Sequence, residues 1–293
     1  LLVAAVAPAF LTQPSLFPVI VLKMLNVSLK KGNSPLSPFA YVSFGIIQGS
    51  VLGDFDAGYA FGRLALELVS RFGNAAKSIE CRTIFMFQTM INHWKFHARD
   101  GKSFYRQAYA AGLESGDLQF SSYSLNNVFF QGLLMRENLS DLAERFSVEH
   151  PVIASLQQYN AYQLFQLNEQ SVLNLKGEAD DLLKLTGKYF DETKVLSEWL
   201  AAKNANALFD FYVAKSRLEY LFGDRQKAYE YALLAEPMED AMSGMMFVPE
   251  QLFFLSLAAA AIYPEAQKKL RKQIRQRLEK NAKRFEKWSY HCE

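Results

Sequence analysis

The sequence lacks most of the features that mark secreted, nucleic-acid-binding or membrane-spanning proteins. Only two cysteines, Cys81 and Cys292, occur in 293 residues, which predicts no disulfide framework and a reducing, cytoplasmic setting. The 32 basic and 30 acidic residues nearly balance, so no chain-wide positive field exists to attract nucleic acid. No uninterrupted apolar stretch approaches the roughly 20 residues that cross a bilayer. We therefore expect neither a nucleic-acid partner nor a membrane span.

Catalytic motifs are also missing. Residues 101–103 read Gly-Lys-Ser, the ending of a phosphate-binding loop, but Phe96 stands where the pattern requires its first Gly. His93 and His97 have the spacing of two zinc ligands on a helix, but no third ligand is identified, and Trp94 occupies the place of a zinc protease's Glu. The more ordinary interpretation turns Trp94 inward and leaves both histidines facing water or capping neighbours. We predict a non-enzymatic segment with no metal and no cofactor.

Apolar residues recur with the helical period of 3.6 along nearly the whole chain. Between residues 55 and 72 they fall on one helical face, and the same spacing returns near residues 84, 228 and 270. Strand-like alternation is absent. We predict an all-α protein of about thirteen helices in antiparallel pairs. Its expected helices include 55–72, 77–99, 102–115, 139–149, 152–175, 178–201 and 205–222.

A Gly-Asp pair joins successive helices at three places. Gly suits the left-handed residue that ends a helix, and Asp accepts hydrogen bonds from the free N–H groups that begin the next one. Small residues such as Ala228 and Ala232 follow the last joint, as in a tetratricopeptide hairpin, and the joints are unevenly spaced. These features predict an irregular tetratricopeptide-like α-solenoid. The predicted hairpin turns are Gly53-Asp54, Gly116-Asp117 and Gly223-Asp224.

The number of helices favours a stack over the alternative all-α form, a closed bundle around one shared core. We expect a single helical-repeat domain over residues 1–293, cut from a longer protein and opening inside a helix. A bend or sub-domain boundary is expected near residues 176–178, where Lys-Gly-Glu interrupts the helical pattern.

The last predicted helix, 265–289, is strongly basic, with ten Lys or Arg and three Glu between residues 265 and 287. Such a helix suits an acidic lipid, a nucleic acid or an acidic protein surface. The favoured alternative is a terminal cap, in which a thin apolar stripe covers the preceding helices and the charges face outward. That stripe consists of Leu270, Ile274, Leu278 and Phe285. The candidate interaction residues of the whole chain are His93, Trp94, His97, Lys268, Arg271 and Arg275.

Several short strings together resemble the helical region of very large multidomain signalling proteins. In those proteins a serine/threonine kinase domain and an AAA-type ATPase module precede a tetratricopeptide-like segment, and a GAF domain with a histidine kinase or another output follows. The strings are Ala7-Pro8-Ala9, Gly32-Asn33-Ser34-Pro35-Leu36-Ser37, Leu52-Gly53-Asp54 with Gly58-Tyr59, His93-Trp94-Lys95 with His97, Ala111-Gly112-Leu113-Glu114 with Gly116-Asp117, Val172-Leu173-Asn174-Leu175, and Ala282 with Phe285.

This resemblance implies a cytoplasmic regulatory segment that couples an ATPase or kinase portion to sensor or output domains. Its partners would be proteins or flanking domains of the same chain. None of the family's catalytic residues can be placed on this sequence, because the motifs of those neighbouring domains are missing. An alternative function is a sensor that binds a small molecule or peptide in the concave groove of the stack.

Overall fold

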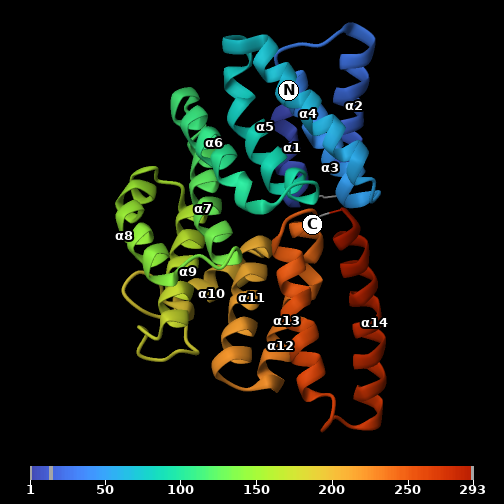
Figure 1. The fold of residues 1–293 in the computed structure, drawn as a ribbon. Coiled ribbons are helices and arrows are strands. Elements are labelled where there is room, and N and C mark those ends of the chain that lie inside the picture. The colour runs from blue at the N-terminus through green and yellow to red at the C-terminus, as the bar shows by residue number, and fades with distance from the viewer. Residues whose placement is uncertain (1, 13–15, 292–293) are drawn as a thin grey trace. The chain divides into compact units, whose positions relative to one another are not determined.

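The computed structural model describes residues 2–12 and 16–291, and its regular structure is helical (Figure 1). Within these ranges there is no β-strand, and the one isolated bridge joins Thr186 to Asp191. The prediction of an all-α protein is confirmed. The chain divides into two compact units, one formed by the residues up to Val128 together with His291 and the other by residues 129–290.

Unit 1 is built from successive helices joined by short connections. Its elements are α1 (Leu2–Thr12), α2 (Leu16–Lys31), α3 (Ser37–Ile46), η1 (Ile47–Val51), α4 (Phe55–Phe72), η2 (Gly73–Ala76), α5 (Lys77–Met90), η3 (Asn92–Trp94), η4 (Ala98–Gly101), α6 (Lys102–Ser115) and the first part of α7 (Leu118–Leu134). Neighbours in the sequence are neighbours in space, most extensively α3 with α4 and α5 with α6.

Helices α3 and α4 approach each other closely because glycines face one another between them. A β-carbon on Gly58 would lie 2.8 Å from the carbonyl oxygen of Gly45, and one on Gly45 would lie 2.7 Å from that of Gly58. Each glycine therefore leaves room for the backbone of the other helix. Gly62, one turn beyond Gly58, makes similar room for the ring of Phe87 on α5.

The helix expected at 77–99 ends early, so His93 lies in a turn and not on an α-helix. Helix α5 stops at Met90, after which the chain folds back through the short turns η3 and η4. Gly101 in η4 packs against the Gln88 amide of α5, where any β-carbon would lie 1.9 Å from Gln88 Nε2. Gln88 Oε1 in turn accepts a hydrogen bond from Asn92 Nδ2 at 2.9 Å. The hydrogen bond from Asn92 holds η3 to the end of α5, and the close packing of Gly101 on Gln88 holds η4 there.

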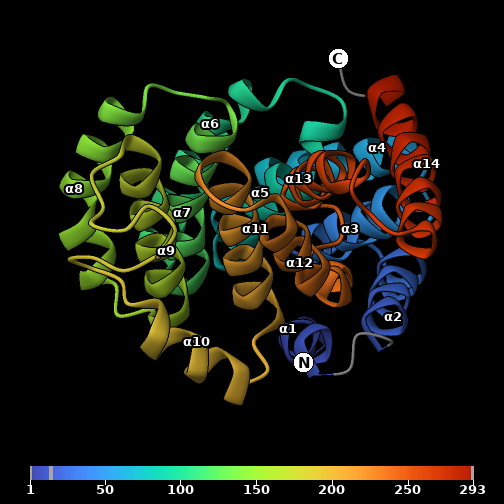
Figure 2. The same ribbon diagram turned by 90° about the horizontal axis from the view of Figure 1, so that it is seen from below.

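Unit 2 contains the rest of α7 and a second series of helices. These are α8 (Leu139–Ser155), α9 (Tyr159–Lys176), α10 (Glu192–Ala201), α11 (Ala205–Phe222), α12 (Arg225–Ala235), η5 (Glu236–Met242), α13 (Phe247–Ile262) and α14 (Lys268–His291). Figure 2 shows α11, α12 and α13 as successive neighbours, in agreement with their contacts. Small residues line the α11–α12 contact, and Ala228 and Ala232 are buried as expected.

Pro151 was expected to separate two helices, and this prediction is wrong. Helix α8 runs through Pro151 to Ser155, and α9 begins only at Tyr159. Leu142, Phe146, His150 and Ile153 form one buried face of α8 on both sides of the proline. Packing of that face outweighs the backbone hydrogen bond that Pro151 cannot donate.

The three Gly-Asp joints behave differently from one another. Gly53 and Gly116 have positive φ values of 74° and 78°, as predicted for residues that end a helix. Gly223 has φ of −124°, so the left-handed conformation predicted there is wrong. A β-carbon at Gly223 would lie 2.9 Å from Leu183 Cδ2, so close packing is the reason that glycine fits this position.

All three aspartates act at helix starts. Asp54 accepts a hydrogen bond from Ala57 N at 2.9 Å, and Asp224 accepts from Gln226 N and Lys227 N. Asp117 Oδ1 lies 3.5 Å from Phe120 N in the first turn of α7, and Asp117 Oδ2 accepts from Arg82 Nε at 2.6 Å, a contact that ties the α6–α7 turn to α5. The capping role predicted for Asp54 and Asp224 is confirmed.

Candidate interaction surface

Helix α14 is attached to unit 2 along one apolar face. Ile274 is fully buried, and Asn281 Nδ2 donates a hydrogen bond to Ser256 Oγ of α13 at 3.0 Å. Partly buried hydrophobic residues extend this face and pack against the core of unit 2. They are Leu270, Leu278, Phe285 and Trp288. The apolar stripe predicted from the sequence thus covers the preceding helices.

The arginines of α14 contact groups of unit 2. Arg277 forms an ion pair with Glu236, and Arg284 Nη1 lies 3.0 Å from Glu239 Oε2, both acids belonging to η5. Arg271 donates to the carbonyl oxygen of Pro264, and Arg275 Nη2 donates to Tyr263 Oη at 3.1 Å. The bond from Arg275 lowers the pKa of Tyr263. These four side chains help to fix α14 on its unit.

The lysines of α14 are arranged differently from its arginines. Five of them are exposed and have no ion-pair or hydrogen-bond partner within residues 2–12 and 16–291. At 100° per residue they lie on the side of the helix opposite Ile274 and Asn281. We call this set the lysine face, and its members are Lys268, Lys269, Lys272, Lys280 and Lys283. Glu279 is exposed on the same side of the helix, so the stripe is positive on balance, with five lysines against this one carboxylate.

The candidate interaction residues fall into two groups. Lys268, Arg271 and Arg275 are exposed on adjoining turns of α14, and their part in an interaction stays a prediction. His93 and Trp94 are buried, with exposures of 4% and 6%, so their assignment to an interaction surface is wrong. Their rings lie 4.7 Å apart, and Trp94 also contacts the ring of Phe55.

His97 is exposed but shares no helix with His93, because α5 ends before both of them. Its Nδ1 accepts a hydrogen bond from Arg99 N at 3.1 Å, so it caps η4. The spacing of two zinc ligands on one helical face therefore does not exist here. Within the described ranges, no group of three or more His, Cys, Asp or Glu residues is arranged to hold a metal ion.

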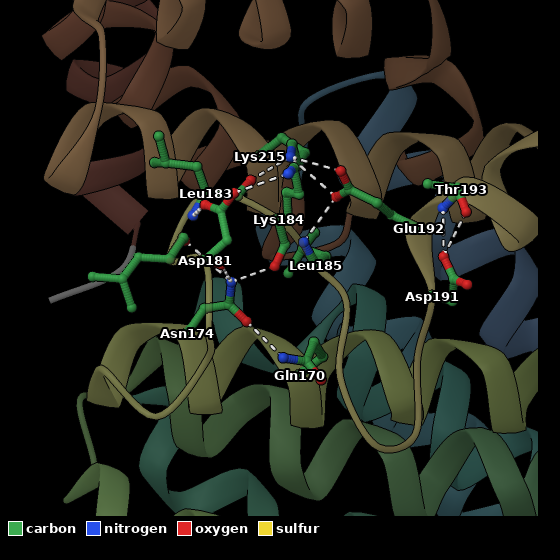
Figure 3. Close-up of polar contacts among 11 residues, drawn as sticks. Gln170, Asn174, Asp181, Leu183, Lys184, Leu185, Asp191, Glu192, Thr193 and Lys215 are labelled. Carbon is green, nitrogen blue, oxygen red and sulfur yellow. Dashed lines mark hydrogen bonds and ion pairs between the residues drawn. The ribbon is translucent and has the colours of Figure 1, made fainter.

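A polar network that the sequence did not predict holds the segment between α9 and α10 (Figure 3). Residues 178–191 belong to the helix expected at 178–201 and are irregular instead. Asn174 Nδ2 lies within hydrogen-bond distance of the carbonyl oxygens of Asp181, Leu182 and Lys184, the closest at 2.7 Å. The Asn174 side chain thus donates to carbonyl groups that would have accepted backbone hydrogen bonds in a helix.

Lys215 of α11 completes this network from the other side (Figure 3). Its ammonium group donates to the Leu183 carbonyl oxygen and lies 3.0 Å from Glu192 Oε2. Glu192 also accepts a hydrogen bond from Leu185 N at 2.8 Å. The side chains of Asn174, Lys215 and Glu192 all have partners inside unit 2, whereas the buried Gln170 Oε1 has no hydrogen-bond partner among the described residues. The network therefore explains the shape of the loop.

A second buried chain of hydrogen bonds joins α8 to α9. His150 Nδ1 lies 2.7 Å from Glu169 Oε2, and His150 Nε2 lies 2.8 Å from Tyr162 Oη. Burial raises the pKa of Glu169, and the bond from His150 opposes that shift. The ring of Tyr189 packs over His150 at 3.9 Å between centroids. The connectivity resembles a catalytic triad, but burial raises the pKa of Tyr162 and makes it a poor nucleophile.

The surroundings of Cys81 argue against a nucleophilic role. Cys81 is buried, and burial raises the pKa of its thiol to about 12. At neutral pH the reactive thiolate is therefore scarce. Cys292 lies outside the described residues.

None of the helices in the described part of the chain is both long and apolar enough to cross a membrane. No protein-family model matches the chain, and no curated protein matches it. The case for a function therefore depends on the surfaces and clusters described above, among which the lysine face is the most exposed and the least satisfied.

Proposed function

We propose that this chain is a non-catalytic docking and regulatory module, and that the lysine face of α14 binds an acidic segment of a protein. One observation carries the proposal. On a single helix, four arginines contact groups of unit 2 while five lysines have no partner among the described residues. The arginines thus hold the helix in place, and the lysines are presented outward.

The chemistry of the face favours an acidic protein over a lipid bilayer. An amphipathic helix binds a membrane by inserting apolar side chains, and the central apolar side chains of α14 are already packed in unit 2. The face offers compact charges on flexible stems, which suit carboxylates distributed along an extended or helical segment. A nucleic acid would meet the same charges, so it serves as a separate arm of the test.

The arrangement of helices supports the finer proposal of a tetratricopeptide-like superhelix. Many consecutive helices pack as neighbours, among them α3 with α4, α5 with α6 and α12 with α13, and small residues lie where α11 and α12 approach. Stacks of this kind usually leave a polar outer face on the terminal helix, which is how α14 is built. We infer from the resemblance stated above that the module couples an ATPase or kinase portion to sensor or output domains.

Coupling would arise through differential affinity. A partner bound along the stack can shift the equilibrium between two arrangements of the attached domains. The size of that shift is set by the difference between its binding free energies for the two arrangements. In this proposal the acidic segment is that partner. It binds when the lysine face is accessible and stabilises the arrangement that exposes it.

The test is a titration with a fluorescent peptide of about 16 residues, rich in Glu, which matches two-thirds of the length of α14. The variant Lys268→Gln, Lys272→Gln, Lys280→Gln and Lys283→Gln should bind about 30-fold more weakly, since each exposed pair contributes about 0.5 kcal/mol. The control variant removes four exposed lysines elsewhere in unit 2. Its substitutions are Lys184→Gln, Lys194→Gln, Lys203→Gln and Lys227→Gln.

The control variant has the same net charge as the test variant and should bind like the unmodified protein. Equal losses in the two variants would show that only net charge matters and would contradict the proposal. Absence of binding to the peptide would contradict it as well. If an RNA or DNA oligonucleotide of matched charge binds more tightly than the peptide, the partner of the lysine face is a nucleic acid and the proposed protein partner is wrong.

A further inference from the structure

Helix α2 of unit 1 exposes apolar side chains on the side opposite its buried face. Phe17, Val21, Met24 and Leu25 face the interior of the unit and are buried. The opposite side carries a second set of apolar residues that is exposed to solvent, with exposures reaching 61% at Val19 and 67% at Leu29. The complete outer set is Leu16, Val19, Leu22, Val27 and Leu29. Clustered exposed apolar side chains mark a candidate interaction surface.

Val19 and three polar residues form a row along the middle of this outer side. Val19, Lys23, Asn26 and Lys30 follow one another at i, i+4, i+7 and i+11 and therefore form a single row. Apolar residues lie on either side of the row, with Leu16 and Val27 on one flank and Leu22 and Leu29 on the other. The two lysines and Asn26 have no partner within the described residues.

The charge pattern of α2 excludes two occupants of this side. Helix α2 contains three lysines and no acidic residue. A second copy docked through the same face would bring lysine rows together, and like charges at such a contact are destabilising. A lipid bilayer would receive the central polar row at the deepest point of insertion, where Lys and Asn are costly.

The remaining occupant is a helix with the complementary pattern. Carboxylates in the centre of an otherwise apolar helical face would pair with Lys23 and Lys30, and apolar residues on either side would cover Leu22, Leu29 and Val27. Paired charges surrounded by apolar contacts also fix the register between two helices. We propose that the outer side of α2 docks an amphipathic helix of a partner protein whose apolar face carries a central row of Asp or Glu.

The test uses two designed helical peptides of about 18 residues, long enough to cover the roughly 24 Å of α2. Both have two rows of Leu flanking a central row, which is Glu in one peptide and Lys in the other. Binding is measured by fluorescence anisotropy to the full chain carrying the four Lys→Gln substitutions on α14. This background removes four of the five lysines of the lysine face, so failure here is independent of the proposed function of α14.

The chain with native α2 should bind the Glu peptide at least about tenfold more tightly than the Lys peptide, given two charge pairs in an apolar contact. The variant Lys23→Glu with Lys30→Glu should reverse that preference. The control variant Lys31→Glu with Lys227→Glu, which makes the same change of charge outside the row, should keep it. The variant Val19→Asn with Leu29→Asn should weaken binding of the Glu peptide by about tenfold, through loss of apolar contact.

Three results would overturn the proposal. The first is equal affinity for the two peptides or no binding of either. The second is sedimentation with phosphatidylcholine–phosphatidylserine vesicles that is lost in the Val19→Asn, Leu29→Asn variant, which would assign the face to a membrane. The third is self-association in sedimentation velocity that the same variant abolishes, which would assign the face to a second copy.

Discussion

At the scale of single residues, the least satisfied group in the core of unit 2 is the carboxyl of Asp210. Its Oδ1 atom is buried and has no hydrogen-bond partner. Burial raises the pKa of Asp210 well above its usual range, the nearby Glu250 carboxylate acts in the same direction, and Arg217 acts against both. A carboxyl in this position favours its protonated form in the folded protein.

Replacement of Asp210 should therefore change how stability depends on pH. Because the pKa of Asp210 is higher in the folded than in the unfolded protein, its contribution to the free energy of unfolding is fully present below the unfolded-state pKa, near pH 4. That contribution is lost as the pH rises through the pKa of the folded state. Asp210→Asn keeps a neutral group at every pH. The variant should match the unmodified protein near about pH 4 and exceed its stability at about pH 8 by roughly 1–3 kcal/mol, the cost of an unsatisfied buried polar group.

Chemical denaturation across that pH range measures the difference, and contributions from other groups such as Glu169 cancel between the two proteins. Asp181→Asn is the matched contrast, because the backbone bond from Leu183 N lowers the pKa of Asp181. The ionised Asp181 stabilises the folded protein above its unfolded-state pKa, so the Asp181→Asn variant should become less stable than the unmodified protein as the pH rises from the acid range. A difference for Asp210→Asn that is constant with pH, or of opposite sign, would show that Asp210 is ionised in the folded protein.

At the scale of elements, helix packing in unit 1 depends on the facing glycines of α3 and α4. Gly58→Ala would place a β-carbon 2.8 Å from the Gly45 carbonyl oxygen, a backbone atom that no side-chain rotation can move away. We expect a loss of stability of about 1–3 kcal/mol, the usual cost of overpacking. Thermal or denaturant unfolding of the purified protein measures it.

Gly49→Ala is the control for this substitution. Its nearest neighbour would be Phe55 Cδ1 at 3.5 Å, an ordinary van der Waals contact. The control should leave the stability unchanged or raise it slightly, because Ala restricts the unfolded chain more than Gly does. Equal effects of the two substitutions would mean that the glycines act through helix propensity and not through the close approach of α3 and α4.

The sequence was most informative about elements whose signals are local. The helices at 55–72, 102–115 and 205–222 were expected within these limits because a capping residue or a glycine lies at their ends and an apolar face runs between them. The apolar and charged sides of α14 were also apparent, since periodicity alone separates them.

The errors arose where long-range contacts decide the outcome. Asn174 and Lys215 bind carbonyl groups of residues 181–184, and no local pattern announces that two distant side chains will replace helical bonds there. Similarly, the burial of His93 depends on the return of the chain toward Gln88, which Gly101 permits. The outward lysines of α14 could be counted from the sequence, but their lack of partners became visible only with the acids of η5 in place.

At the scale of the whole molecule, the positive charge is concentrated on one helix. The chain has a formal net charge of +2, while α14 and its approach carry ten basic and three acidic residues. The attraction of an acidic partner must therefore be local, and salt should weaken it, because exposed charges are screened over about 8–10 Å at physiological ionic strength.

Docking of an acidic segment on the lysine face is tested most directly by exchanging the charges on both sides of the contact. The affinity of a glutamate-rich peptide and of a matched lysine-rich peptide is measured for the unmodified protein and for the variant Lys268→Glu, Lys272→Glu, Lys280→Glu and Lys283→Glu. Glu and Lys have similar helix propensity, so α14 should remain folded in the variant, which circular dichroism checks. The expected result is that the variant no longer binds the acidic peptide and binds the basic one instead. Its affinity for the basic peptide should lie within about tenfold of the affinity of the unmodified protein for the acidic peptide. An unmodified protein that binds neither peptide, or a variant that still prefers the acidic one, would contradict a docking role for α14.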